Sequence, residues 1–166
     1  MSDSVQPTPL PYRDRYTDTD FDDLCWHDNY IHGIAIRHEE FEAELVLDID
    51  FVVGCTGDEN TSPRYWLSPA SLTFQGVTDL KINIDWASDA PGVLIHCASM
   101  DGIARTCGSD SPGCGARSSP RWRIDINWPR AGIIEFRADG FVQILRSKPI
   151  LWDCDLLPAS QRPPFA

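Results

Sequence analysis

Leu45-Val46-Leu47-Asp48-Ile49-Asp50-Phe51 is the stretch that decides the fold, because its pattern occurs three times in the chain. Residues 80–86 (LKINIDW) and 122–128 (WRIDINW) repeat it as apolar, variable, apolar, Asp or Asn, Ile, Asp or Asn, aromatic. A period of two places the apolar side chains on one face of a β-strand and the polar ones on the other. Three such strands can wall a core and display their polar side chains outward. If they lie side by side, these side chains form one acidic face that suits a hard cation or a basic partner; separated strands with solvated polar rows are the favoured alternative. The candidate binding residues on that face are Asp48, Asp50, Asn83, Asp85, Asp125 and Asn127.

The rest of the chain also reads as short strands separated by turns. Apolar alternation or bounding Gly and Pro residues mark segments 31–37, 69–74, 93–97, 133–138 and 141–146. A 3.6-residue apolar pattern never lasts beyond about two turns, and only residues 19–24 indicate a short helix. We expect an all-β, mainly antiparallel sandwich or flattened barrel of about eight to ten strands, with one short N-terminal helix.

A length of 166 residues fits one domain with a core of its own. Residues 1–18 are polar and proline-bearing, which predicts a flexible N-terminal arm. Residues 19–157 form the expected β domain, and residues 158–166, with three prolines, form a C-terminal tail. Within the domain, residues 100–120 are rich in Gly, Ser and Cys and are expected to be one long loop.

The dipeptide Asp139-Gly140 is the strongest turn signal in the chain. Asp-Gly favours the positive φ angles of a two-residue type I′ turn, so residues 133–138 and 141–146 are predicted to form a hairpin. Its buried face is expected to carry Ile134, Phe136, Phe141 and Leu145.

The charge of the chain limits its partners. It has 14 Lys and Arg against 25 Asp and Glu, a formal net charge of −11. Nucleic-acid and anionic-membrane surfaces need clustered cations, so neither partner is expected. The charge permits a basic protein or a cation as partner, although a charge of this kind in most cases only keeps a protein in solution. Residues 1–20 lack the apolar core of a signal peptide, and the sequence contains no apolar run of about 20 residues. We therefore expect a cytoplasmic protein with six free thiols; its oligomeric state is left open.

The cysteines give a weak metal signal. Cys107 and Cys114, with His96 and Cys97, offer thiolate and imidazole ligands for zinc. The six residues between the two loop cysteines exceed the usual two to four between paired ligands, so loop cysteines without metal are favoured. The sequence also has no glycine-rich phosphate loop and no GxSxG motif, and we expect no metal and no cofactor.

A second candidate is the polar cluster Trp26, His27, Asp28 and Asn29. A histidine held by a carboxylate can act as a general base. Adjacent residues in a strand or turn point in different directions, however, so His27 and Asp28 are expected to have different partners. A structural turn beside a buried Trp is favoured over a catalytic role.

The order of several motifs resembles a family of small uncharacterised bacterial all-β proteins. The motifs are residues 26–29 (WHDN), 44–50 (ELVLDID), 68–74 (SPASLTF), 77–80 (VTDL), 123–125 (RID), 139–141 (DGF) and 161–162 (QR). More distantly, the strand order and acidity are similar to those of immunity proteins of bacterial polymorphic toxin systems. That resemblance implies a protein that binds a toxin, and it assigns no functional residues.

We expect a non-catalytic protein-binding module, which fits an immunity-type inhibitor of a basic partner. The net charge, the polar strand faces and the lack of a catalytic motif support this hypothesis. The alternative is a metal-dependent hydrolytic enzyme that uses His27, Asp28 and the strand aspartates. A pocket that collects histidines and carboxylates would favour the enzyme, and an open acidic patch would favour the binding protein.

Overall fold

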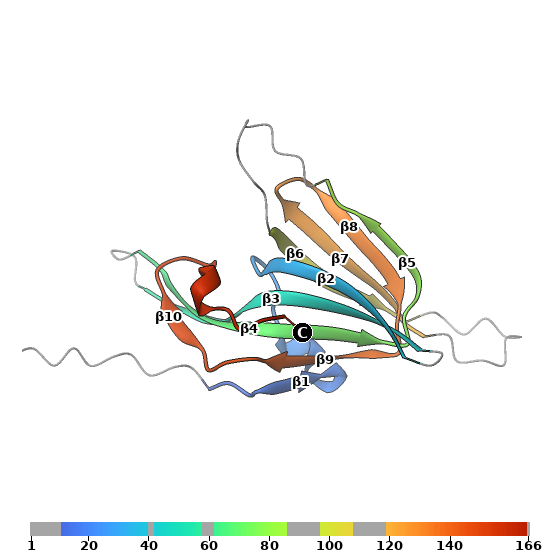
Figure 1. The fold of residues 1–166 in the computed structure, drawn as a ribbon, viewed down its shortest axis with the longest axis horizontal. Coiled ribbons are helices and arrows are strands. Elements are labelled where there is room, and N and C mark those ends of the chain that lie inside the picture. The colour runs from blue at the N-terminus through green and yellow to red at the C-terminus, as the bar shows by residue number, and fades with distance from the viewer. Residues whose placement is uncertain (1–10, 40–41, 58–61, 86–96, 108–118, 166) are drawn as a thin grey trace, which may run out of the picture.

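The computed structural model describes residues 11–39, 42–57, 62–85, 97–107 and 119–165 (Figure 1). These residues form ten strands and two short 3-10 helices, so the predicted all-β, antiparallel class is confirmed. In chain order the elements are β1 (Arg15–Thr17), η1 (Asp18–Asp23), β2 (Tyr30–Glu39), β3 (Glu42–Thr56), β4 (Arg64–Gln75), β5 (Thr78–Asn83), β6 (Ala98–Thr106), β7 (Arg121–Trp128), β8 (Gly132–Arg137), β9 (Gly140–Leu145), β10 (Ile150–Trp152) and η2 (Ala159–Gln161).

All described strands belong to one sheet of order β1-β9-β4-β3-β2-β6-β7-β8-β5, with β10 beside β4. Figure 1 shows the half made of β6, β7, β8 and β5 rising at an angle from the other half. The two halves meet at β2 and β6, whose pairing consists of Tyr30 with Ser99 and Ile31 with Ala98. The sheet bends at this short junction, and its ends, β1 and β5, remain apart.

The core fills the inside of the bend. Phe74 of β4 packs against Trp122 of β7 and Phe136 of β8, with ring centroids 5.1 and 4.7 Å apart. The apolar positions of the first repeated stretch are all buried there, as predicted, and so are the first three of the third stretch: Leu45, Leu47, Ile49, Phe51, Trp122, Ile124 and Ile126. Trp128, the last aromatic position of the third stretch, is 45% exposed, so the prediction is wrong for this residue. Burial of each such side chain contributes about 1.5–3 kcal/mol. The fold is therefore sandwich-like, although one continuous sheet supplies both layers.

Helix η1 closes the core from the N-terminal side. Phe21 contacts the rings of Trp26, Trp122 and Phe141. The carboxylate of Asp20 accepts a hydrogen bond from the Thr17 amide (2.9 Å), which satisfies one donor at the start of the helix. The predicted short helix is thus present, as a 3-10 helix.

The predicted loop over residues 100–120 is wrong in its first part. Residues 98–106 form β6, which pairs with β2 and β7. Register shifts on both sides of Met100 interrupt the strand, and such bulges hide the alternation on which a strand prediction depends. Residues 108–118 and most of the predicted strand 93–97 lie outside the described residues.

The predicted hairpin at Asp139-Gly140 is also wrong. β8 pairs with β5 and β7, whereas β9 pairs with β1 and β4, so this dipeptide connects the two halves of the sheet. The glycine allows a close approach: a Cβ on Gly140 would lie 2.2 Å from a carboxylate oxygen of Asp18, so this side chain would have to move. That carboxylate accepts a hydrogen bond from the Phe141 amide (3.2 Å). The predicted buried residues are nevertheless correct: Ile134, Phe136, Phe141 and Leu145.

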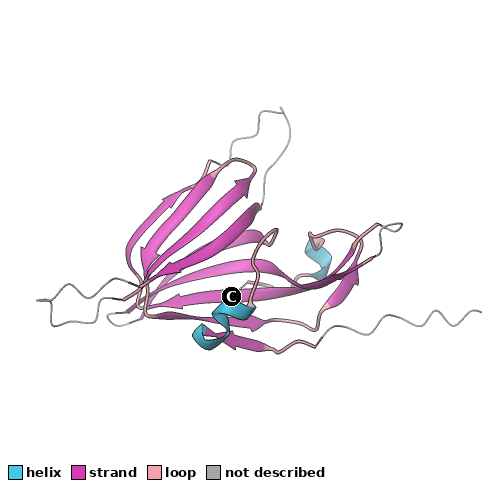
Figure 2. Cartoon of the chain, turned by 180° about the vertical axis from the view of Figure 1, so that it is seen from behind, coloured by secondary structure: helices cyan, strands magenta, loops and turns pink. Residues whose placement is uncertain are grey.

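Both ends of the described chain belong to the domain. β1 pairs with β9, and Tyr16 within it is buried against Phe51, so the predicted arm enters the sheet before residue 18. The predicted tail carries η2 and packs on the sheet. Seen together, Figures 1 and 2 place η1 and η2 on opposite faces of the same half of the sheet. Among the described residues, no helix has the length and apolarity needed to cross a membrane.

Candidate functional site

The three repeated stretches do not lie side by side. β2 and β6 separate β3 from β7, and β8 separates β7 from β5. The six predicted binding residues therefore do not form a single acidic patch, which agrees with the favoured expectation that the three strands are not adjacent. Each stretch instead presents its polar side chains to a different environment on the outer face, the face turned away from the core.

Asp48 and Asp50 of β3 are buried, with exposed fractions of 7% and 0%. The prediction that they face solvent is wrong because the C-terminal segment (residues 153–165) covers the outer face of this half. Phe165 lies against Gly33, where a Cβ would be 3.4 Å from its ring, and the Leu157 amide donates to Asp50 Oδ2 (2.9 Å).

Two arginines neutralise these carboxylates. Arg162 binds Asp50 through Nη1 and Asp48 through Nη2, and Arg146 binds Asp48 through Nη2. We name these four residues the arginine clamp. Two carboxylates and two guanidinium groups balance in charge, as buried ions must.

The clamp also holds the end of the chain. Arg146 Nη1 donates to the carbonyl oxygens of Pro163 (3.1 Å) and Pro164 (3.0 Å), and its guanidinium lies 5.8 Å from the centre of the Phe165 ring. The sequence prediction missed both arginines. The signal available was chemical: if Asp48 and Asp50 are buried, the chain must supply cations to pair with them.

His32 joins the clamp because of a β-bulge. The register of β2 against β3 shifts between Ile31 and Gly33, which leaves His32 as the extra residue. A bulge re-aims a side chain, and His32 Nε2 lies 2.9 Å from Asp50 Oδ2 on the outer face. Asp50 is thus contacted by Arg162, His32 and a backbone amide.

Of the predicted cluster 26–29, Trp26 and Asn29 have structural roles. Trp26 Nε1 donates to Gln143 Oε1 (2.8 Å) in the core. Asn29 is fully buried; its Oδ1 accepts from the Val52 amide (2.8 Å) and its Nδ2 donates to the His27 carbonyl (3.1 Å). These bonds fix the turn that leads into β2.

His27 and Asp28 lie on the surface of that turn. His27 Nε2 is 3.4 Å from Asp28 and Nδ1 is 3.3 Å from Asp101 Oδ1, so the expectation that His27 and Asp28 have different partners is wrong. The left-handed backbone of Asp28 (φ 60°) brings its carboxylate toward the imidazole. Asp48 and Asp50 do not join this group, since both bind arginine. The described part of the chain contains no group of three His, Cys, Asp or Glu side chains arranged to hold a metal ion.

The outer face of the other half is exposed or half-buried, and we call it the open face. Three cross-strand rows follow from the registers, each written in the strand order β5, β8, β7, β6. They are Asn83, Ile133, Asp125 and Gly102; Lys81, Glu135, Arg123 and Ala104; and Thr78, Arg137, Arg121 and Thr106.

One end of the open face is acidic. A hollow of about 480 Å³ there is lined by Asn83, Asp125 and Asn127, three of the six predicted binding residues, with Asp101 and Arg123. Arg123 Nε donates to Asp125 Oδ1 (2.9 Å), and this bond raises the pKa of the guanidinium. We name it the acidic hollow. Asp85, the sixth predicted residue, is exposed and bonded to Arg130 Nη1 (2.7 Å).

The opposite end of the open face is cationic. A hollow of about 300 Å³ is lined by Lys81, Arg121 and Arg137, together with Asp79 and Glu135. We name it the cationic hollow. The open face is therefore dipolar along its strands, a pattern suited to a protein surface with complementary charges.

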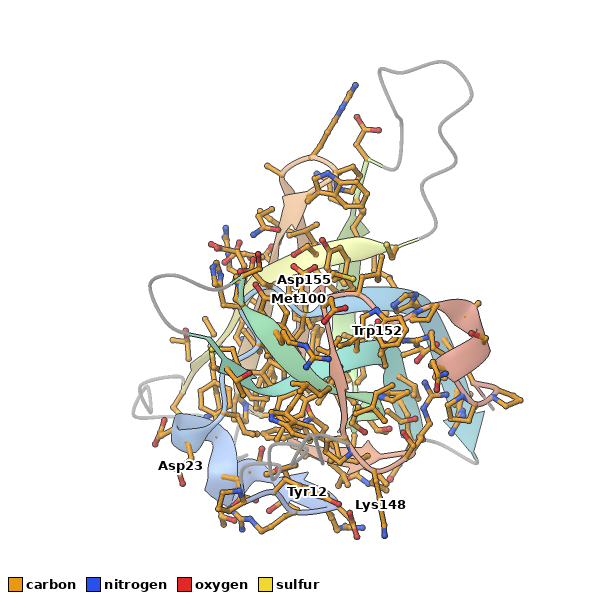
Figure 3. The ribbon with its side chains drawn as sticks, turned by 90° about the vertical axis from the view of Figure 1, so that its left-hand side faces the viewer. Tyr12, Asp23, Met100, Lys148, Trp152 and Asp155 are labelled. Carbon is orange, nitrogen blue, oxygen red and sulfur yellow. The ribbon has the colours of Figure 1, made fainter. Side chains whose placement is uncertain are left out.

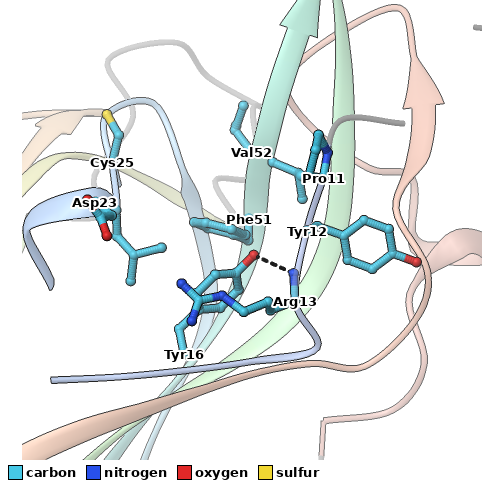
Figure 4. A pocket seen from close by; sticks show the side chains of 10 residues that line it. Pro11, Tyr12, Arg13, Tyr16, Asp23, Cys25, Phe51 and Val52 are labelled. Carbon is cyan, nitrogen blue, oxygen red and sulfur yellow. Dashed lines mark hydrogen bonds between the residues drawn. The ribbon is translucent and has the colours of Figure 1, made fainter. Parts of the chain in front are cut away.

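A further hollow of about 350 Å³ lies where residues 11–16 cross β3 (Figure 4). Two contacts join residues at this hollow. Tyr16 Oη accepts from the Arg13 amide (3.1 Å; Figure 4). The Arg13 side chain binds Asp20 (2.8 Å). These contacts tie the N-terminal residues to the sheet.

The described cysteines form no disulfide: Cys25, Cys55, Cys97, Cys107 and Cys154. Cys114 and His96, two of the four zinc candidates, lie outside the described residues. Cys97 is buried, which raises the pKa of its thiol, and the charge of Asp155 raises it further; Asp155 is labelled in Figure 3.

Comparisons of the chain with protein-family models, curated proteins and solved structures found no match. A functional hypothesis for this chain therefore rests on the geometry of the open face and of the arginine clamp.

Proposed function

We propose that the protein is a non-catalytic protein-binding module that recognises a basic partner protein through the acidic hollow of the open face. The observation that carries the proposal is the meeting of Asn83, Asp125 and Asn127 around one exposed hollow with Asp101. The net charge of −11 supports it, since opposite charge steers a basic protein toward the chain.

The arginine clamp determines which face is available. Asp48 and Asp50 are neutralised inside the molecule and offer nothing to a partner. Asp125 is also paired, with Arg123, but this ion pair and Asp101 are reachable from solvent, and polar groups of this kind form the rim of protein interfaces. An immunity-type inhibitor of a basic protein fits this arrangement. It also fits the similarity in strand order and acidity between the sequence and immunity proteins of polymorphic toxin systems.

Charge reversal tests the proposal. Asp125→Lys reverses a charge in the acidic hollow, and the matched control Asp153→Lys makes the same change at a residue 85% exposed on the other half. Both variants have the same net charge, so long-range steering is equal and only a local contact distinguishes them. Each full chain is immobilised, incubated with extract of the source cells, and its captured proteins are quantified by mass spectrometry.

A basic protein captured by the wild type and by Asp153→Lys, but reduced about tenfold or more with Asp125→Lys, supports the proposal. Equal capture by both variants contradicts it, because steering alone then explains the binding. The proposal is also contradicted if the wild-type chain captures no protein in greater amount than Asp125→Lys does.

A further inference from the structure

The cationic hollow contains a like-charge pair within the sheet. Arg121 of β7 and Arg137 of β8 are direct cross-strand partners, and both point to the outer face. Like charges directly opposite each other destabilise a sheet. The chain has 25 acidic residues and a net charge of −11, yet no carboxylate lies between these two arginines in the sheet. An arginine pair left in this way indicates a site for an anion from outside the chain.

Carboxylates of the described residues neutralise this arginine pair only in part. Arg137 donates to the Ser119 carbonyl (3.0 Å) and lies 3.4 Å from Asp79, a carboxylate that is 69% exposed. Within the described residues, Arg121 and Lys81 lie beyond ion-pair distance of any carboxylate. Three cations and two carboxylates line the hollow, which leaves a net charge of +1 (3 − 2).

The backbone beside the hollow is unusual. The register of β5 against β8 shifts between Thr78 and Lys81, and Asp79 within the shift has φ 54°. Aspartate is one of the residues that adopt left-handed backbone most readily. Here the bulge turns Asp79 toward Arg137, which leaves the Arg121 side of the hollow uncompensated.

We propose that the cationic hollow receives a carboxylate side chain of the same partner that docks on the open face. This inference rests on the proposed function and adds the second contact point. The fork of an arginine binds a planar carboxylate through two parallel hydrogen bonds, and one negative charge balances the surplus of +1.

The registers also give the spacing of the two contacts. The row of Asp125 and the row of Arg121 are four residues apart along β7, and strands rise about 3.3 Å per residue. The partner therefore presents a basic and an acidic side chain roughly 13 Å apart. On an extended segment these are positions i and i+4, which point to the same side.

Short peptides test the inference without knowledge of the partner. Acetylated and amidated peptides of sequence KTVTE and KTVTQ are titrated into the ¹⁵N-labelled full chain and followed by NMR. KTVTE reaches both hollows and KTVTQ only the acidic one. We expect KTVTE to bind about three- to fivefold more tightly, the gain of one exposed charge pair. In Arg121→Gln the two peptides should bind equally, with KTVTQ unchanged.

The outcomes separate the two proposals. Shifts near Asp125 caused by KTVTQ, lost in Asp125→Lys, report on the acidic hollow alone. If KTVTE binds no more tightly than KTVTQ, or keeps its advantage in Arg121→Gln, the carboxylate site does not exist while the proposed function stands. If neither peptide perturbs the open face, the inference is overturned, and the capture experiment decides the proposed function independently. Arg121→Gln relieves a repulsion, so loss of folding does not confound the result.

Discussion

Arg162→Gln is the change that tests most directly what anchors the C-terminal segment. The Arg162 side chain is 9% exposed and binds two carboxylates that are 10% and 0% exposed. Removing one partner of a buried ion pair costs about 3–5 kcal/mol, since the remaining charge is left without compensation. Asp48 keeps Arg146, and Asp50 keeps His32 and a backbone amide, so we expect the lower end, about 3 kcal/mol.

The assay is urea unfolding followed by the fluorescence of the six tryptophans. A loss of about 3 kcal/mol corresponds to a fall in Tm of roughly 6–12 °C for a chain of this size. The matched control is Arg64→Gln, which breaks the ion pair with Asp153 (2.6 Å). Because these side chains are 47% and 85% exposed, its effect should stay within about 0.5 kcal/mol.

A double-mutant cycle separates the ion pair from general packing. Asp50→Asn with Arg162→Gln removes one charge of each sign and leaves Asp48 paired with Arg146. The double variant should therefore be more stable than the sum of the single losses predicts, by about 1–3 kcal/mol. Additive losses, or an Arg162→Gln effect as small as that of Arg64→Gln, would refute the arginine clamp as the anchor.

Three further changes test other parts of the structure. Gly140→Ala places a Cβ 2.2 Å from a carboxylate oxygen and should lower the unfolding free energy by about 1–3 kcal/mol. A Cβ on Gly102 meets nothing within 4 Å, so the control Gly102→Ala should change this free energy by less than about 0.5 kcal/mol, and equal effects in urea unfolding would contradict the close approach. Asn29→Ala leaves a buried amide and carbonyls unpaired and should cost about 2–3 kcal/mol, against less than about 0.5 for the exposed His27→Ala; the reverse order would show that the turn does not depend on Asn29. Burial raises the pKa of the Cys97 thiol above its usual 9.0, so the stabilising contribution of the neutral thiol is complete below pH 9 and is lost as the pH rises further. The free energy of unfolding, measured between about pH 8 and 11, should therefore depend less on pH in Cys97→Ala, and an unchanged slope would contradict this assignment.

The inward half of each strand is the part of the fold that the sequence predicts well. Alternation in residues 45–51 and 122–126 identifies the inward apolar positions correctly, because the side chains of one strand face the core wherever that strand lies in the sheet. It fails at Trp128, which is exposed at the end of β7. In the second stretch Leu80 and Ile84 pack only partly and Ile82 is 43% exposed, since β5 is at the edge of the sheet. Alternation carries no information on which strands are adjacent, however. It therefore cannot predict that β8 pairs with β7 and β5 and not with β9.

The outward positions show which features of the candidate site alternation can predict. Asn83, Asp125 and Asn127 line one exposed hollow, although their strands β5 and β7 are separated by β8. The environment of Asp50 depends on Arg162, which is 112 residues away in the chain, and no local pattern near Asp50 indicates that contact. The bulge that turns His32 toward Asp50 likewise breaks the period of two from which its orientation was inferred.

The bend in the sheet explains why one sequence pattern serves two purposes. On one side of the β2–β6 junction the C-terminal segment covers the outer face, and Asp48 and Asp50 become internal ion-pair partners. On the other side the same alternation leaves Asp125 and Arg121 on an exposed face. The arginine clamp and the open face share no residue, so the stability loss in Arg162→Gln and the binding loss in Asp125→Lys report on different halves of the sheet. A variant that impaired both would indicate that the halves do not fold independently of their outer faces, and the division proposed between a structural half and a binding half would fail.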